Sequence, residues 1–439
     1  MEQNLPEHKL TPAQYRRNAI GFGSDLSLFG VAMAFISSST VLPAFIKALT
    51  QSEVLVGVAS GLTSAAWMLP QLVVASLVAQ LPRKKPVMVT AACIGRPLML
   101  VLAAVIWLLG DRAPMVTVGI TMATLFIFFV IDSVVSIPWF DVIAVALPPR
   151  RRGRLLGIGT ALSGIGGIGA GLVVRYVLSD ACPLVFPTNF ALLYGLAGIV
   201  FVISAIGLLI VIEPEGRVEA HKKPGLRAVV RSLPRILRQD AGFQAVTAVR
   251  IVNGLASIAT AFYVLYATDH LGFGIEDTGY FVSAQVMGSL VAGLLMGLVQ
   301  DKWGPLTHMR ILILVTVTPP LLALLAAPMA ALWAGGVWYV YLLLYLCLGI
   351  SFGTMGWPFF NWIMESAPDA ERPLYIGLIN TLSALTMLAP TLGGVIVRHA
   401  SYQVVFALAV LFCIVAWLLM ARVPDTRGET AVPHEPESA

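Results

Sequence analysis

Pro138 to Ser163 reads PWFDVIAVALPPRRRGRLLGIGTALS, and Pro358 to Ser383 reads PFFNWIMESAPDAERPLYIGLINTLS. The two stretches align without a gap at an offset of 220 residues, half of the 439-residue chain, and eight of 26 positions are identical. Ordinary composition would give about two identities. Each copy is an apolar segment that ends in a proline-containing basic turn, followed by a second apolar segment. We therefore expect two homologous halves, each a bundle of membrane helices, rather than a coincidental match of two apolar stretches.

The composition places the chain in a membrane. Hydrophobic residues make up 58% of the sequence and charged residues 12%, whereas a soluble domain has about 25% charged residues. These charges are too few to cover a water-facing surface, so the net charge of +5 is not interpreted as a nucleic-acid-binding surface. The four cysteines show no metal-ligand spacing, and we expect no metal, no cofactor and no disulfide. The polar N-terminal stretch predicts no cleavable signal peptide.

Twelve apolar segments are long enough to cross a bilayer, whose hydrocarbon core of about 30 Å requires roughly 20 helical residues. The predicted fold is therefore all-α, with twelve transmembrane helices in two pseudo-symmetric six-helix bundles. The predicted spans are Ile20–Leu49, Val54–Leu81, Val87–Leu109, Met115–Leu147, Leu155–Leu178, Phe190–Ile212, Phe243–Thr268, Thr278–Gln300, Met309–Trp333, Gly336–Glu365, Leu374–Arg398 and Tyr402–Ala421.

Basic residues lie almost entirely on one side of this topology. One set of connecting segments contains 22 lysines and arginines, and the opposite set contains four, namely Lys47, Arg112, Arg175 and Arg398. Because cytoplasmic loops are enriched in basic residues, both termini and the middle loop are predicted to be cytoplasmic. We expect a multi-pass integral protein of the plasma (inner) membrane, in contact with membrane lipids.

The domain boundaries follow from the repeat. We expect an N-terminal bundle at residues 1–212, a cytoplasmic linker at 213–241, a C-terminal bundle at 242–422 and a disordered tail at 423–439. Between residues 225 and 239 the linker places apolar and basic side chains on different helical faces. This pattern predicts an amphipathic helix on anionic lipid, with a solvated basic linker as the alternative.

A loop motif between the eighth and ninth predicted helices indicates a family. The sequence Gly297-Leu-Val-Gln-Asp301-Lys302-Trp303-Gly304 resembles the G-x-x-x-D-[R/K]-x-G signature of the major facilitator superfamily. Twelve spans, a 6+6 repeat and a long central loop resemble the same family over essentially the whole chain. The equivalent loop of the first half keeps its basic residues but lacks the acid and the glycines. In the eleventh predicted helix, the residues from Pro390 to Gly394 resemble part of an antiporter motif.

The resemblance implies a secondary transporter whose halves rock around a central small-molecule site. It implies that helices 1, 2, 4, 5, 7, 8, 10 and 11 surround this site. It also implies that Gly297, Asp301, Lys302 and Gly304 form a cytoplasmic gate with Arg154 at the start of helix 5. The apolar cavity helices favour export of an amphiphile over sugar uptake, with protons as the coupling ion. The alternative is a non-transporting assembly factor or receptor; no enzymatic activity and no nucleic-acid partner are expected.

Away from their ends, the predicted spans contain five charged residues, each of which costs about 3 kcal/mol on insertion scales. They are Asp25, Arg96, Asp132, Asp141 and Arg250. Our hypothesis is that Asp25 or Asp132 binds a proton or a cationic substrate group, and that Arg250 supplies positive charge from the other half. For Arg96 we favour a structural ion pair with Asp132 or Asp25. Asp141 is expected to meet the arginines at 150–154.

Three uncharged side chains complete the predicted substrate or proton site. They are Trp139, Asn253 and Asn361. Trp139 and Asn361 lie in the repeated stretch beside prolines that can break a helix near a cavity, and packing at a kink is the alternative. The glycine-rich segment from Gly157 to Gly171 contains G-x-G-x-x-G, but inside a membrane span this spacing indicates close helix packing rather than a nucleotide site.

Overall fold

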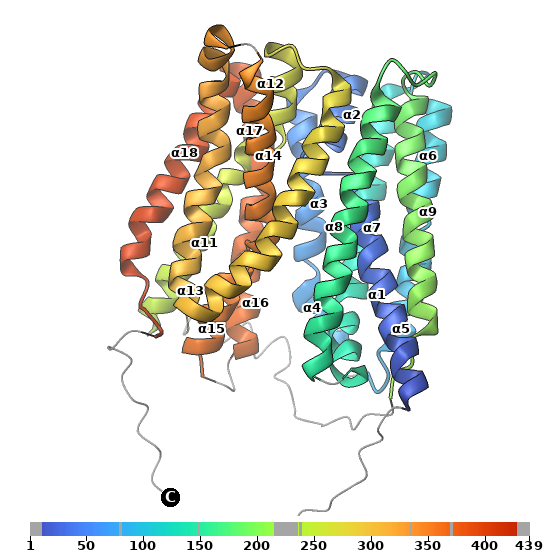
Figure 1. Ribbon diagram of the computed structural model, residues 1–439, viewed down its shortest axis with the longest axis vertical. Coiled ribbons are helices and arrows are strands. Elements are labelled where there is room, and N and C mark those ends of the chain that lie inside the picture. The colour runs from blue at the N-terminus through green and yellow to red at the C-terminus, as the bar shows by residue number, and fades with distance from the viewer. Residues whose placement is uncertain are drawn as a thin grey trace, which may run out of the picture.

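The computed structural model describes residues 11–78, 81–147, 149–214, 236, 239–333, 335–368 and 372–427. Over this part of the chain every regular element is a helix, which confirms the predicted all-α fold, and the two halves form two bundles (Figure 1). The first half contains α1 (Pro12–Phe35), α2 (Val41–Thr50), α3 (Glu53–Met68), α4 (Gln71–Val78), α5 (Lys85–Gly95), α6 (Leu98–Leu109), α7 (Pro114–Ala146), α8 (Pro149–Leu178) and α9 (Thr188–Ile210). The second half contains α11 (Ala241–Leu255), α12 (Phe262–His270), α13 (Thr278–Leu332), α14 (Gly336–Thr354), α15 (Trp357–Ser366), α16 (Arg372–Ser383), α17 (Ala389–His399) and α18 (Tyr402–Leu419).

The helices make the twelve predicted crossings. Among the described residues, ten helical segments are long and apolar enough to span a membrane. One of them contains α13, which crosses twice because the backbone turns at Gly304, where φ is 78° and ψ is 176°. This left-handed φ favours glycine, which explains the glycine of the loop motif. The two shorter helices α3 and α4 together make the remaining crossing.

Local chemistry explains where several helices begin and end. Thr11 and Gln14 form a capping box at the start of α1, and the Asp240 carboxylate accepts the amide of Phe243 at 2.7 Å at the start of α11. Pro97 separates α5 from α6, because proline cannot continue the hydrogen-bond ladder of a helix. The third crossing is therefore broken directly after Arg96.

The internal repeat extends beyond the stretch that revealed it. The first predicted span is not one helix, since α1 ends at Phe35 and α2 begins only at Val41. In the second half, α11 ends at Leu255, a 3-10 turn follows, and α12 begins at Phe262. The ends of α1 and α11 lie 220 residues apart, the offset of the sequence repeat. The first helices of the two halves thus end at equivalent positions.

The two repeated prolines, Pro138 and Pro358, lie in different helical contexts. Pro358 lies in the first turn of α15, directly after the break that follows α14. Pro138 lies inside the continuous helix α7. The predicted helix break at a proline therefore occurs in the second half alone.

The predicted tail needs correction at its start. Val423 is buried, the carbonyl of Pro424 accepts a hydrogen bond from Trp362 Nε1 at 3.0 Å, and Arg427 Nη2 lies 2.5 Å from Glu365 Oε1. Residues 423–427 therefore belong to the C-terminal bundle, because their side chains and backbone are held by α15. The tail beyond residue 427 lies outside the described residues, as does nearly all of the predicted amphipathic linker helix.

The two halves touch through glycines on the predicted outer side. A Cβ built on Gly57 of α3 would lie 2.1 Å from the Pro390 carbonyl oxygen of α17. A Cβ on Gly279 of α13 would lie 2.3 Å from the Gly171 carbonyl oxygen of α8. Only glycine leaves room for such backbone contact between membrane helices. The glycine-rich segment of α8 is thus a packing surface, as the sequence predicts.

The same helices separate toward the predicted cytoplasmic side. A Cβ on Gly164 of α8 would still meet Leu290 of α13 at 2.8 Å. Cβ atoms built farther along, on Gly153 and Gly157 of α8 and on Gly293 and Gly297 of α13, would meet nothing within 4 Å. The start of α1 and the end of α18 lie at this end of the molecule, at the bottom of Figure 1. The protein is therefore closed at its predicted outer end and open at its predicted cytoplasmic end.

Topology is testable by labelling in a cysteine-free background. We expect an impermeant thiol reagent to modify Asp111→Cys in intact cells, because the connection between α6 and α7 is predicted to be external. Glu219→Cys in the central loop should react only after permeabilisation. Labelling of Glu219→Cys but not Asp111→Cys in intact cells would contradict the orientation.

Candidate functional site

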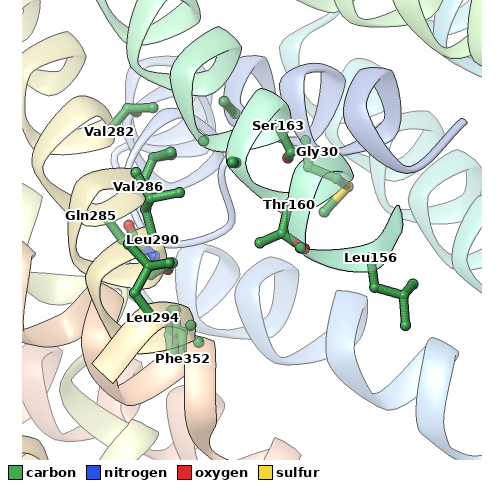
Figure 2. A pocket seen from close by; sticks show the side chains of 18 of the residues that line it. Gly30, Leu156, Thr160, Ser163, Val282, Gln285, Val286, Leu290, Leu294 and Phe352 are labelled. Carbon is green, nitrogen blue, oxygen red and sulfur yellow. The ribbon is translucent and has the colours of Figure 1, made fainter. Parts of the chain in front are cut away.

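A cavity of about 650 Å³ lies between the two halves. It is lined by α1, α8, α13, α14 and the start of α15. Figure 2 shows Leu156, Thr160 and Ser163 on one side of the cavity and residues of α13, including Gln285 and Leu290, on the other. Within the described part of the chain, its lining contains no charged side chain. The polar lining residues are Ser37, Ser38, Thr160, Ser163, Gln285, Ser289 and Trp357.

Hydrogen bonds between the halves close the outer end of this cavity. Ser39, in the break between α1 and α2, donates to Gln285 Oε1 at 2.6 Å. Ser283 of α13 donates to the carbonyl of Ile168 in α8 at 3.0 Å. Because the first crossing is broken here, the Ser39 hydroxyl can reach the second half of the protein. The cavity therefore has a polar outer end and largely apolar walls.

A buried ion pair holds the first bundle together. Arg96 Nη1 lies 2.6 Å from Asp25 Oδ1, and both side chains are buried. Ser204 of α9 donates to Asp25 Oδ1 at 2.7 Å, and Trp139 of α7 donates to Oδ2 at 2.9 Å. Both carboxylate oxygens of Asp25 are thus engaged. Through Asp25, charge-assisted hydrogen bonds connect α1 with α7, with α9 and with Arg96 at the end of α5.

Asp132 is the second carboxylate of this cluster and is held less tightly. It is half-buried on α7 and accepts a hydrogen bond from Trp67 of α3. Its carboxylate also interacts electrostatically with Arg96 and Asp25. The cluster contains two carboxylates and one guanidinium, and the guanidinium of Arg96 forms its ion pair with Asp25. Asp132 therefore lies beside the 2.6 Å pair without being a member of it.

Arg250 occupies a different environment in the second bundle. It is buried on α11, and its Nη2 donates to Asn380 Oδ1 of α16 at 2.9 Å. Its guanidinium lies 5.6 Å from the ring centre of Phe359 and 5.0 Å from that of Phe360. Among the described residues no carboxylate pairs with it, and its Nη1 has no hydrogen-bond partner. One turn farther along, Asn253 Oδ1 is also buried without a partner.

The remaining predicted site residues lie away from the cavity lining. Trp139 is buried against Phe22 and contacts Asp25, and Asn361 is half-buried on α15. Asp141 pairs with Lys84 Nζ, because the connection before α5 reaches the inner end of α7, and no ion pair joins it to Arg152 or Arg154. The side chains of Arg150 and Arg151 lie outside the described ones, so the expectation for Asp141 is corrected for Arg152 and Arg154 alone.

Sequence reasoning did not single out the hydroxyl groups of the cavity. Thr160 and Ser163 lie on α8, and Ser37 and Ser38 lie at the break after α1. Serine and threonine are common in membrane helices as packing residues, so their presence alone does not distinguish a lining position. Two features of the sequence could have indicated these lining positions. Thr160 and Ser163 lie in the repeated stretch, and Ser37 and Ser38 lie in a run of hydroxyl residues inside an apolar segment.

The predicted gate residues lie around an open cytoplasmic side. Asp301 is exposed, and its backbone carbonyl accepts a hydrogen bond from Arg427 Nη1 at 3.0 Å. Lys302 Nζ lies 4.8 Å from the ring centre of Trp303, and Arg154 is exposed on α8. Within the described residues, the Asp301 carboxylate makes no hydrogen bond or ion pair with α8. A lock between Asp301 and the start of α8 remains a prediction for the opposite state.

We expect Asp301→Asn to shift the protein further toward the inward-open state. A carboxylate at a helix N-terminus stabilises by about 0.3–1 kcal/mol, or near 2 when partly buried. Its loss should change the ratio of the two states by up to roughly thirtyfold. Spin labels at the start of α8 and beside Gly304, where α13 turns, measure this ratio as two separations. An unchanged distribution would rule out the lock.

The outer side provides a control of opposite sign. Lys47 Nζ lies 2.5 Å from Glu53 Oε1 and 3.5 Å from Asp269 Oδ2, so it links the first half to the second. Tyr402 donates to the same Asp269 carboxylate at 2.9 Å. We expect Lys47→Gln to favour the outward-open state modestly, because a partly exposed pair contributes about 1 kcal/mol or less. A shift in the same direction as Asp301→Asn would contradict the two-gate scheme.

Comparison with known proteins gives a family and a fold. The family model of the Major Facilitator Superfamily matches residues 26–389. A mutant of the nucleoside transporter NupG has a TM-score of 0.69 at 14% identity, covering 94% of this chain and 100% of its own. A D-xylose-proton symporter has 0.63 at 16%, covering 95% and 98%, and the E. coli fucose:proton symporter FucP has 0.57 at 14%, covering 94% and 100%. No curated protein matches the sequence.

Proposed function

Because the chain belongs to the major facilitator superfamily, we propose that it is a secondary transporter that moves a small organic solute by proton-coupled alternating access. The observation that carries this proposal is the unequal packing of the halves. They touch through backbone contacts at Gly57 and Gly279 on one side and leave a cavity of about 650 Å³ open toward the other. Such a structure has an evident second state, in which the closed and open sides exchange.

The cavity supports a small amphiphilic substrate. Its volume falls within the range of about 300–1,000 Å³ that is typical of ligand sites. The walls are mostly apolar, and a few hydroxyls, Gln285 and Trp357 provide directional hydrogen bonds. A sugar would require a denser set of polar groups, because each buried hydroxyl without a partner costs binding energy.

The charge cluster supports proton coupling through Asp132. Protonation of Asp25 would leave Arg96 without its partner at 2.6 Å, and breaking a buried pair is costly. Asp132 can be protonated while that pair stays intact. Two of the structural relatives are named as proton symporters, which is compatible with this role without assigning it.

The test uses purified protein in liposomes that contain a pH-sensitive dye. We expect members of a panel of amphiphilic solutes to drive proton movement, and to change the population of the two cytoplasmic separations of α8 and α13. In a non-transporting assembly factor or receptor, the cytoplasmic distance between α8 and α13 would have a single value at every pH. It would also stay the same with every solute whose binding raises the melting temperature. That result would overturn the transport proposal.

A further inference from the structure

The internal repeat relates two residues of the apolar cavity to two charged residues outside its lining. Gly30 of α1 and Phe352 of α14 line the cavity from opposite halves. The offset of 220 residues, which the helix ends of α1 and α11 also obey, relates Gly30 to Arg250 and Phe352 to Asp132. Equivalent positions in two repeats occupy equivalent places about the pseudo-two-fold axis. Arg250 and Asp132 therefore take the two places that Gly30 and Phe352 take on the cavity side.

The hydrogen-bond partner of Arg250 obeys the same relation. Thr160 lines the cavity from α8, and its counterpart at the offset of 220 is Asn380 of α16. Asn380 accepts from Arg250 at 2.9 Å. Where the first half has the hydroxyl of Thr160, the second half thus has the side-chain amide of Asn380, which binds Arg250.

We propose that Arg250 binds the anionic group of the substrate, and that an organic monoanion with an apolar body is carried together with one proton on Asp132. This inference rests on the proposed transport function and specifies its substrate class. The buried Nη1 of Arg250 has no partner, and the aromatic rings of Phe359 and Phe360 flank the guanidinium. Arg250 lies outside the lining of the 650 Å³ cavity. A carboxylate or sulfonate would accept from Nη1 at the repeat-related place, with its apolar body extending between the two halves.

The charge balance of the membrane interior supports one proton per anion. Inside the described spans, away from their ends, Asp25 and Arg96 cancel, which leaves the negative charge of Asp132 in one half and the positive charge of Arg250 in the other. The interior of the described spans is therefore neutral in the empty carrier. Adding a monoanion at Arg250 and a proton at Asp132 keeps it neutral. Adding either alone leaves an uncompensated charge in the membrane, which is expensive.

This balance favours symport of an anionic substrate. In antiport the proton-loaded carrier would bear one excess positive charge and the anion-loaded carrier one excess negative charge. The charged groups that face Asp132 from the neighbouring helices are Arg96 of α5 and Asp25 of α1, with the Trp67 indole of α3 as hydrogen-bond donor. Since Arg96 and Asp25 remain paired, one proton per cycle is the expected stoichiometry.

The binding test compares three molecules of similar shape and different charge. Benzoate, benzyl alcohol and benzylamine are titrated into detergent-purified protein, with binding read from calorimetry. We expect benzoate to bind and benzylamine not to bind. Arg250→Gln should weaken benzoate binding by about tenfold or more, because it removes a charge-assisted bond. Arg112→Gln, an exposed arginine outside the site, should leave it unchanged.

The flux test uses benzenesulfonate, which does not cross liposomes as a neutral acid. We expect it to drive proton entry at a rate that a potassium–valinomycin clamp of the membrane potential does not change. Asp132→Asn should abolish proton entry and retain benzoate binding, whereas Arg250→Gln should lose both. The melting temperature of each variant separates loss of binding from loss of folding.

The outcomes separate this inference from the proposed function. If benzyl alcohol drives proton movement and neither anion binds, the transport function stands and the anion site is wrong. If anions bind equally to the native protein and to folded Arg250→Gln, Arg250 is not the anchor. A flux that reverses sign with membrane potential would overturn the one-to-one stoichiometry. Absence of any solute-driven proton movement, with one fixed separation of α8 and α13, would overturn the transport function itself.

Discussion

Asp132→Asn is expected to abolish proton-driven accumulation of substrate. Asparagine keeps the shape of the side chain and its hydrogen bond with Trp67 but cannot bind the coupling proton. One coupled proton stores about 1.4 kcal/mol per pH unit, so a gradient of two units supports roughly hundredfold accumulation. That factor should fall to about one in the variant. Exchange of labelled for unlabelled substrate across the membrane should persist, because it requires no net proton movement.

A second acid on the same helix provides the control. Asp141 lies nearer the inner end of α7 and pairs with Lys84, so Asp141→Asn should retain accumulation. Uptake and exchange are measured in the same proteoliposomes. Wild-type accumulation by Asp132→Asn would exclude this residue as the coupling site.

Arg96→Gln is expected to be the most destabilising single change in the charge cluster. It leaves the buried Asp25 and the half-buried Asp132 near each other without a cation, and removing one partner of a buried pair costs about 3–5 kcal/mol. Asp25→Asn should cost less, because Asp132 remains to compensate Arg96. Thermal and denaturant unfolding in detergent measure this order.

The double variant distinguishes an ion pair from simple packing. Asp25→Asn with Arg96→Gln removes both members of the pair and leaves Asp132 as the only charge of the cluster. Its loss of stability should therefore be smaller than the sum of the two single losses, with a coupling energy of about 0.5–3 kcal/mol. Additive losses would show that the 2.6 Å contact contributes no pairwise stabilisation.

The membrane class, the crossings and the two-bundle fold were predictable from the sequence. Long apolar segments identify membrane helices because lipid cannot hydrogen-bond a bare backbone. The repeat identifies the halves because both descend from one six-helix pattern and keep its turn residues. The break in the seventh crossing was not predictable, because the apolar signal continues through Ala256 without a proline. The break in the first crossing coincides with four hydroxyl residues at 37–40, which were counted as part of one long span. The order at residues 423–427 was missed because it depends on contacts of Val423 and Arg427 with α15 and its neighbours.

The sequence by itself determined which residues had to be explained. The cost of burying charge in lipid selects Asp25, Arg96, Asp132 and Arg250 from a chain that is 12% charged. It does not assign partners, because Asp25 and Arg96 lie far apart in the sequence and meet only when α1 and α5 both pack against α9. Tertiary structure alone decided that Arg96 neutralises Asp25, that Asp132 is held more loosely, and that Arg250 has no acid beside it in the described bundle. Electrostatic interaction depends on distance in space, which local sequence patterns do not encode.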